Sequence, residues 1–327
     1  MALGHHVRSV SGLLGIALTG LALEAAAQPE FPVKPIRLIV PSGAGGGTDG
    51  TTRMVAPKLD EFFGQRVLVE NRPGAGSIVG TEVVARSAPD GYTLLTAISS
   101  MTIQPSIAKN LPFDPVRDFA PVSQYVSLPN ILLGHSSLPP KNVKELIAFA
   151  RARPGKLEFA SAGTGSSLHM SMELFLSMAG LKMVHVPYKS ATIGIGDVVA
   201  GHLPLMVNNM IVGTQYVKSG RLHAYGVTSA ARSKSAPEIP TIAEQGVPGY
   251  EAVQWYGMVA PAGTPREVVA RLHKGVVFAL QDPGTRERLV SSGADPVGNT
   301  PDEFAALIRS EVVKWAKVVK AAGIARE

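Results

Sequence analysis

The chain has 327 residues, of which 45% are hydrophobic and 17% are charged, and its formal net charge is +6. It contains no cysteine, which excludes thiol catalysis, disulfides, zinc–thiolate sites and a lipid-modified cysteine. Its basic residues are spread along the sequence without runs, so we expect no nucleic acid as a partner. The length and apolar content suffice for one large domain or two ordinary domains.

The first 27 residues have the pattern of a secretory signal peptide. Arg8 precedes a short apolar stretch that ends in Ala25, Ala26 and Ala27. The stretch is too short to span a bilayer as a resident helix. We therefore predict cleavage after Ala27, which gives an exported mature chain.

A glycine-rich stretch, Pro41–Gly50 (PSGAGGGTDG), follows a predicted buried strand at 36–40 and precedes a predicted helix from about Met54. Such a loop presents free backbone N–H groups at the positive end of a helix, a geometry that binds anions. The plainer interpretation is a tight turn and a capped helix, in which Thr48 or Asp49 occupies the cap position. The number of glycines exceeds what a cap requires, which favours the anion site.

The same pattern returns in the second half of the chain. A predicted strand at 157–160 leads into Ser161–His169 (SAGTGSSLH) and then into a helix. VLVENRPGA matches MVHVPYKSA in kind, GYTLLTAIS matches GHLPLMVNN, and the segment beginning at Gly257 matches the one beginning at Asn130. The alternation of strands and helices in two similar halves predicts two α/β domains.

We expect one domain from residues 28–100 plus 250–327, and a second from 101–249. Each should contain a mostly parallel sheet. Ligands bind at the carboxyl ends of strands in such sheets, so the two glycine-containing loops should line opposite sides of one cleft.

A dozen ordered segments resemble the Bug/TctC family, the extracytoplasmic solute receptors of tripartite tricarboxylate transporters. They include FPVKPIRLIVPSGAGGGTD, VLVENRPGAGS, APDGYTLL, ELIAFARARPGKLEFASAGTGSSLH, HVPYK, PEIPTIAEQGVPGYE and WYGMVAPAGTP. The resemblance implies a type II periplasmic-binding-protein fold that closes over a small organic carboxylate. It also implies a periplasmic transport protein that is not an enzyme, needs no cofactor or metal, and delivers its solute to membrane subunits. We expect a monomer.

In that family, backbone amides, hydroxyls and ordered water hold the carboxylate. The matching positions of the first side are Ser42, Gly43, Gly47, Thr48, Asp49, Asn71, Gly74 and Ser77. Those of the second side are Ser161, Gly163, Thr164, Ser166, His169, Tyr188, Lys189 and Asn208. Three residues depart from the family pattern: Ser77 and Ser190 replace common glycines, and Asn208 replaces a frequent aspartate that could hold an ammonium group. Asn208 therefore argues against an amino-acid ligand.

Several of these residues also have plainer roles. His169 could be a satisfied polar residue on a half-buried helix face, and Lys189 could be a solvated surface lysine. Asp49 is acidic beside an anion site, which favours a capping role over ligand contact. Trp255 and Tyr256 could stack on a ligand ring, although a hinge or core position is more typical.

A dinucleotide-dependent oxidoreductase would use Gly43 and Gly45 with Glu70 at the next strand end, but Thr48 weakens the fingerprint and export separates the protein from nicotinamide cofactors. Hydrolysis lacks a recognisable nucleophile elbow or metal motif. A receptor that reports ligand occupancy to a sensor protein has the same sequence features as a transport receptor.

Overall fold

The computed structural model describes residues 1–2, 4 and 31–326. The predicted cleavage site and nearly all of the predicted signal peptide therefore lie outside the described residues. From Phe31 onward the chain forms one compact unit with two β-sheets. In the part of the chain that the structure describes, every helix is too short or too polar to cross a membrane.

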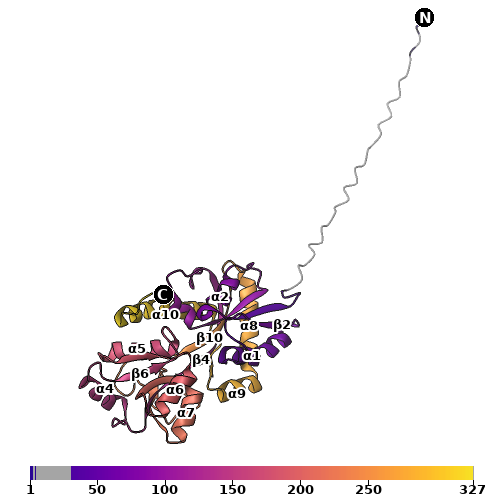
Figure 1. Ribbon diagram of the computed structural model, residues 1–327. Coiled ribbons are helices and arrows are strands. Elements are labelled where there is room, and N and C mark those ends of the chain that lie inside the picture. The colour runs from indigo at the N-terminus through magenta and orange to yellow at the C-terminus, as the bar shows by residue number, and fades with distance from the viewer. Residues whose placement is uncertain (3, 5–30, 327) are drawn as a thin grey trace. The chain divides into compact units, whose positions relative to one another are not determined.

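The first sheet has six strands in the order β11-β4-β10-β3-β1-β2. Its interior strand β1, between β3 and β2, has the sequence IRLIV, and all of its residues except Arg37 are buried. The strands are β1 (Ile36–Val40), β2 (Val67–Asn71), β3 (Thr93–Ile98), β4 (Phe119–Leu128), β10 (Gln254–Pro261) and β11 (Asp295–Pro296). The helices of this half are α1 (Gly47–Phe63), η1 (Ala75–Ser77), α2 (Ile78–Ala85), α3 (Ser100–Ile107), α8 (Arg266–Gln281) and α9 (Pro283–Ser291). We call this half the first lobe (Figure 1).

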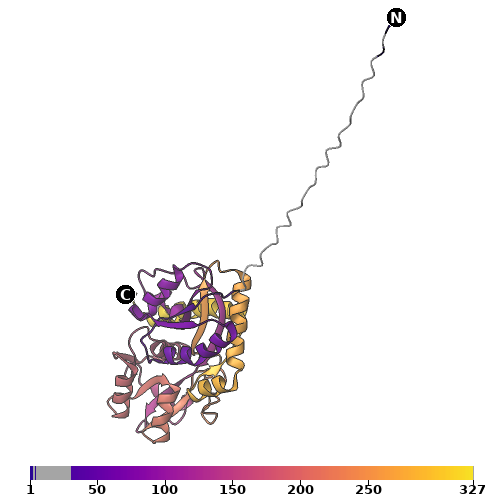
Figure 2. The ribbon, with the colours of Figure 1, turned by 90° about the vertical axis from the view of Figure 1, so that its right-hand side faces the viewer.

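The second sheet has five strands in the order β7-β6-β8-β5-β9. They are β5 (Asn130–His135), β6 (Glu158–Ser161), β7 (Val184–Pro187), β8 (Leu205–Asn209) and β9 (Leu222–Val227). The helices of this second lobe are α4 (Val143–Arg151), α5 (Ser167–Ala179), α6 (Ala191–Val199) and α7 (Met210–Lys218). Figure 2 shows the two groups of helices from the side.

The strand orders confirm the internal match that the sequence predicts. The series β2-β1-β3-β10-β4 corresponds, strand for strand, to β7-β6-β8-β5-β9. Both glycine-containing loops consequently follow equivalent strands, β1 and β6, and both lead into a long helix.

The sheets are mixed, whereas we expected them to be mostly parallel. Strands β2 and β3 run parallel to β1, but β10 is antiparallel to both β3 and β4. The chain leaves the first lobe at the end of β4 and re-enters it at the start of β10. These two strands are paired side by side, so they run in opposite directions and the sheet becomes mixed. The passage to the second sheet falls between Leu128 and Asn130, later than the boundary expected after residue 100.

Helix α10 (Pro301–Ala322) contributes to the cores of both lobes. Thr300 and Glu303 form a capping box at its start. Phe304 belongs to a core cluster of the first lobe, whereas Trp315 belongs to the core cluster of the second. Figure 1 shows α10 beside α5.

Gly257, in the middle of β10, provides a test of this crossing strand. An added Cβ would lie 2.5 Å from Phe304 Cζ and 2.8 Å from the Ser123 carbonyl oxygen. We expect Gly257→Ala to lower the free energy of unfolding by roughly 1–3 kcal/mol, measured by urea denaturation. Gly196→Ala is the control, because an added Cβ there meets nothing within 4 Å and α6 should gain about 0.5–1 kcal/mol. Equal stability of the two variants would contradict the packing described here.

Candidate functional site

The first loop is shaped by the side chain of Asp49. Helix α1 begins at Gly47, and its cap residue is Gly46, with no side-chain cap. The expected cap at Thr48 or Asp49 is therefore wrong. Asp49 is the third residue of the helix, in its first turn, and its side chain accepts a hydrogen bond from the Gly45 N–H at 2.8 Å.

Two further contacts fix that carboxylate. Arg53 Nε donates to it at 2.9 Å and Asn71 Nδ2 at 3.0 Å, and the same Asn71 nitrogen donates to the Ser42 carbonyl at 3.1 Å. Asp49 is only 4% exposed. Burial acts to raise its pKa, but the hydrogen bonds from Arg53, Gly45 and Asn71 outweigh burial and hold the pKa below its usual value. Asp49 and Asn71 therefore hold the loop in shape from behind.

The first turn of α1 leaves backbone donors open. Within the described residues, no hydrogen bond occupies the N–H groups of Gly47, Thr48 and Asp49. The hydroxyl of Ser42 is also buried without a partner there. Unpaired N–H groups at a helix N-terminus favour an anion.

The second loop is tied down by its own hydroxyls. Ser166 caps α5 and accepts from the His169 N–H at 3.2 Å. Ser161 Oγ accepts from the Gly163 N–H at 3.0 Å and lies 2.6 Å from His185 Nε2. The Gly165 N–H donates to His169 Nδ1 at 3.1 Å. These contacts give the loop a fixed shape without a charged side chain pointing at its helix N-terminus.

The two histidines behind this loop are stacked. His169 and His185 have ring centroids 3.8 Å apart, and His169 is 2% exposed. Because Nδ1 of His169 accepts a hydrogen bond, its neutral ring carries the proton on Nε2, 3.4 Å from Glu173. Burial, and then the neighbouring His169, lower the pKa of His185 to about 4. Both ring nitrogens of His169 thus have partners inside the chain.

Strand β10 brings the two helix N-termini to one place. Gln254 Nε2 donates to the hydroxyl of Ser167, the first residue of α5, at 2.7 Å. The Tyr256 hydroxyl lies against the first turn of α1, 3.3 Å from the position that a Cβ would take on Gly47. Residues two apart on a strand share a face and are separated by about 7 Å. The starts of α1 and α5 therefore lie over neighbouring positions of the same face of β10.

A cavity of about 340 Å³ is lined by residues that follow β2 in the first lobe and by Thr164 of the second loop. It is lined by Ala75, Gly76, Ile78, Gln104, Ile107, Ala108, Thr164, Ile324 and Ala325. Gln104 Nε2 donates to the Gly76 carbonyl at 3.1 Å, which fixes the amide at the edge of the cavity. Volumes of this order are typical of small-molecule sites.

Four other residues that the sequence predicted for the site differ in exposure and in hydrogen bonding. Ser77 has φ +87°, which explains why glycine suits that position, and its hydroxyl is 2.9 Å from Ser100. The Tyr188 hydroxyl donates to Asp197 at 2.5 Å, and this bond raises the pKa of Tyr188 to about 12. Lys189 is exposed. Asn208 is 1% exposed, and its amide oxygen accepts from the Asn209 N–H.

Three polar residues of the site were not predicted: Gln104, Ser167 and Gln254. Gln104 lies on the helix that follows β3, so the rule that ligands bind at strand carboxyl ends could have indicated it. Ser167 directly follows the predicted loop residue Ser166. Gln254 stands next to the predicted aromatic pair but has no motif of its own.

Two lobes joined by antiparallel crossing strands, with two helix N-termini meeting over one of them, define a solute-binding receptor of the periplasmic-binding-protein type. The chain belongs to the family described as the tripartite tricarboxylate transporter family receptor, which matches residues 51–324. The family and its structural neighbours are solute-binding proteins, so the chain is a receptor and not an oxidoreductase or a hydrolase.

Individual relatives agree along nearly the whole chain. Protein BugT of Bordetella pertussis is 36% identical over 310 residues, covering 94% of this chain and 95% of BugT. The R. palustris protein solved with adipate is 34% identical with a TM-score of 0.76, covering 91% of this chain and 100% of that one. MatC from Rhodopseudomonas palustris with bound malate is 30% identical with a TM-score of 0.73, covering 88% and 100%.

Removing the Asp49 carboxylate tests whether this side chain shapes the first loop. We expect Asp49→Ala to cost roughly 1–3 kcal/mol of stability, because the donors of Gly45, Arg53 and Asn71 lose a charged acceptor that is itself buried. Thermal unfolding measures this change. Asp302→Ala is the control, since Asp302 is an exposed acid in the first turn of α10. A loss no larger than that of the control would count against the tether.

The stacked histidine pair predicts a pH dependence of stability. The pKa of His185 is lower in the folded chain than the usual 6.5, so the unfolded chain binds more protons between about pH 6.5 and 4. Its contribution is therefore fully present above pH 6.5 and is lost as the pH falls toward 4. We expect His185→Gln to flatten the stability profile in this window, measured by denaturation at successive pH values. His202→Gln, at a histidine 73% exposed, should leave the profile in place.

Proposed function

We propose that this chain is an exported periplasmic receptor that captures a small dicarboxylate and delivers it to the membrane subunits of a tripartite tricarboxylate-type transporter. The observation that carries the proposal is the meeting of two helix N-termini over β10, with open N–H groups on α1. Two such termini suit a solute with a carboxylate at each end. Relatives that were solved with adipate and malate support a dicarboxylate.

The chemistry of capture follows from the donors. Backbone N–H groups at a helix terminus bind a carboxylate without a charged side chain, and the helix dipole adds to the attraction. Water bound to the open donors would be exchanged for carboxylate oxygens, so affinity arises from fixed geometry. The net charge of +6 attracts anions from a distance. The buried amide of Asn208 offers no carboxylate for an ammonium group, which disfavours amino acids.

Closure of the two lobes is the conformational part of the proposal. The crossing strands β4 and β10 are the natural hinge, because the chain passes between the sheets next to them. Ligand that contacts both helix N-termini would bias the equilibrium toward the closed form. The membrane subunits would then recognise that form.

A thermal-shift panel of the purified chain tests capture directly. Malate, succinate, adipate and citrate are compared with glutamate and with NAD. A ligand at about 100 times its Kd should raise the stability by about 2.7 kcal/mol, a shift of several degrees. Stabilisation by a dicarboxylate supports the proposal. Stabilisation by glutamate alone, by NAD alone, or by nothing in the panel counts against it.

Delivery is separated from sensing by an uptake assay with the ligand found in that panel. A strain without this chain should lose uptake of the radiolabelled ligand, and a plasmid copy should restore it. If the strain without this chain still takes up the ligand but loses ligand-dependent gene expression, the chain is instead a receptor that reports ligand occupancy to a sensor protein.

Thr164 provides a test within the cavity. Thr164 belongs to the second loop and is exposed. It lines the cavity together with residues of the first lobe. We expect Thr164→Val to weaken dicarboxylate binding by roughly 1–3 kcal/mol, because ligand oxygens lose a hydroxyl partner, as measured by calorimetry. Thr164→Ser keeps the hydroxyl and should retain most of the affinity. Equal affinities of the Val and Ser variants would remove Thr164 from the site.

A further inference from the structure

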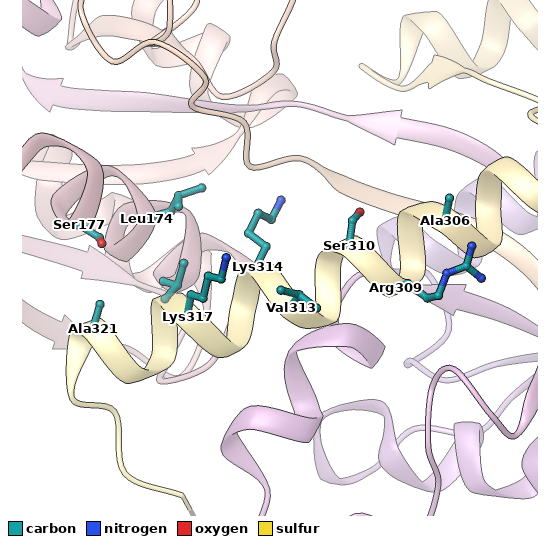
Figure 3. A pocket seen from close by; sticks show the side chains of 10 residues that line it. Leu174, Ser177, Ala306, Arg309, Ser310, Val313, Lys314, Lys317 and Ala321 are labelled. Atoms are coloured by element: carbon teal, nitrogen blue, oxygen red, sulfur yellow. The ribbon is translucent and has the colours of Figure 1, made fainter.

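A groove of about 770 Å³ runs between α5 and α10, away from the residues of the candidate site. It is lined by Leu174 and Ser177 of α5 and by Ala306, Arg309, Ser310, Val313, Lys314, Lys317, Val318 and Ala321 of α10. Figure 3 shows the labelled side chains of α10 along the helix, with Leu174 and Ser177 beside them.

The floor of the groove is mostly apolar, with Leu174, Ala306, Val313, Val318 and Ala321. On α10, Ala306, Val313 and Ala321 lie on one helical face together with Ser310 and the stem of Lys317, since these positions recur at intervals of three and four residues. This face extends for about 22 Å at 1.5 Å per residue. Val313 is 55% exposed, although its neighbours Leu174 and Val318 are buried. The groove has the length and surface of a site for an amphipathic helix.

The edges of the groove are basic. Arg309 and Lys317 are exposed, and among the described residues neither forms an ion pair with a carboxylate. Lys314 is different, because it pairs with Glu311 and donates to the Glu251 carbonyl. The residues that line the groove include no acid. A basic edge beside an apolar floor is complementary to a segment with acidic and apolar faces.

We propose that this groove binds an acidic amphipathic helix of the membrane partner, an inference that rests on the proposed function of delivery. A second copy of this chain is a poorer occupant, because the net charge of +6 makes two copies repel each other.

The position of the groove couples it to the state of the lobes. Helix α10 contacts the first lobe through Phe304 and Ile308, and the second lobe through Trp315 and Val318. The other side of the groove is α5, whose first residue Ser167 is hydrogen-bonded to β10 at the candidate site. Movement of one lobe against the other changes the spacing of the groove walls, so the partner distinguishes the two states there.

The test uses two fluorescent peptides of about 15 residues, matched to the length of the groove. One has leucines along one helical face and glutamates on its flanks, and the other has lysines in place of the glutamates. Their binding to the full chain is measured by fluorescence anisotropy at low and high salt, with and without the dicarboxylate found above. We expect the glutamate peptide to bind, to bind more weakly at high salt, and to change affinity when the dicarboxylate is present.

Charge-reversal variants test whether the glutamate peptide binds in the groove. Arg309→Glu with Lys317→Glu should weaken the glutamate peptide at least about ten-fold, and Val313→Glu should do the same by removing the apolar contact. The control pair is Lys274→Glu with Arg286→Glu, two exposed basic residues on α8 and α9, and it should bind like the original chain. Dicarboxylate affinity should be unchanged in every variant.

Four results would overturn the inference. The first two are that the glutamate peptide does not bind, and that the lysine peptide binds as tightly as the glutamate peptide. The other two are that the control pair loses as much affinity as Arg309→Glu with Lys317→Glu, and that the dicarboxylate does not change the affinity of the glutamate peptide. A dimer in sedimentation analysis that Val313→Glu dissociates would assign the groove to a second copy instead. Failure of every dicarboxylate to stabilise the chain is a separate result, which contradicts the proposed function and not the groove.

Discussion

The antiparallel pair of β4 and β10 is the constraint on which the rest of the structure depends. It carries both passages between the lobes and occupies adjacent positions in the first sheet. Because β10 also holds Gln254 and Tyr256 on one face, the strand that joins the lobes also locates the two helix N-termini. The candidate site therefore depends on a long-range strand pairing more than on any single loop.

Around that strand, the chain uses buried side chains to shape backbone. Asp49 and Asn71 hold the first loop, and Ser161, His169 and His185 hold the second. None of these needs to contact the solute to be important for binding. A loop made of glycines has little shape of its own, so its geometry must come from partners outside it. This division explains how an acidic side chain can lie directly behind the proposed anion site: Asp49 accepts hydrogen bonds from Arg53, Asn71 and Gly45, and Arg53 balances its charge.

The local pattern of the sequence was enough to predict the repeated strand–loop–helix units. An apolar run such as IRLIV predicts a buried strand, and the glycines after it predict a loop. The similarity between the two halves of the sequence then predicted which strands correspond. The pairing of β4 with β10 was not predictable in the same way, because it joins residues more than a hundred positions apart and Phe119–Leu128 has no distinctive pattern. For the same reason the sheets were expected to be mostly parallel, and Gln104 and Gln254, which carry no motif, were missed.

Specificity in such a site is set by distance more than by charge. In the proposed site, backbone donors at the starts of α1 and α5 would accept any carboxylate, so they would not distinguish one diacid from another. The spacing between the donors would distinguish them. So would the apolar lining of the cavity, where Ile78, Ile107 and Ile324 are placed to contact the chain between the two carboxylates of the proposed ligand. A carbon chain of the right length buries its methylenes there, at about 0.8 kcal/mol for each CH₂. A hydroxyl or a third carboxylate on that chain must find a polar partner such as Gln104 or lose affinity. If the proposed site is correct, the few polar groups of the cavity decide among ligands that the helix termini accept equally.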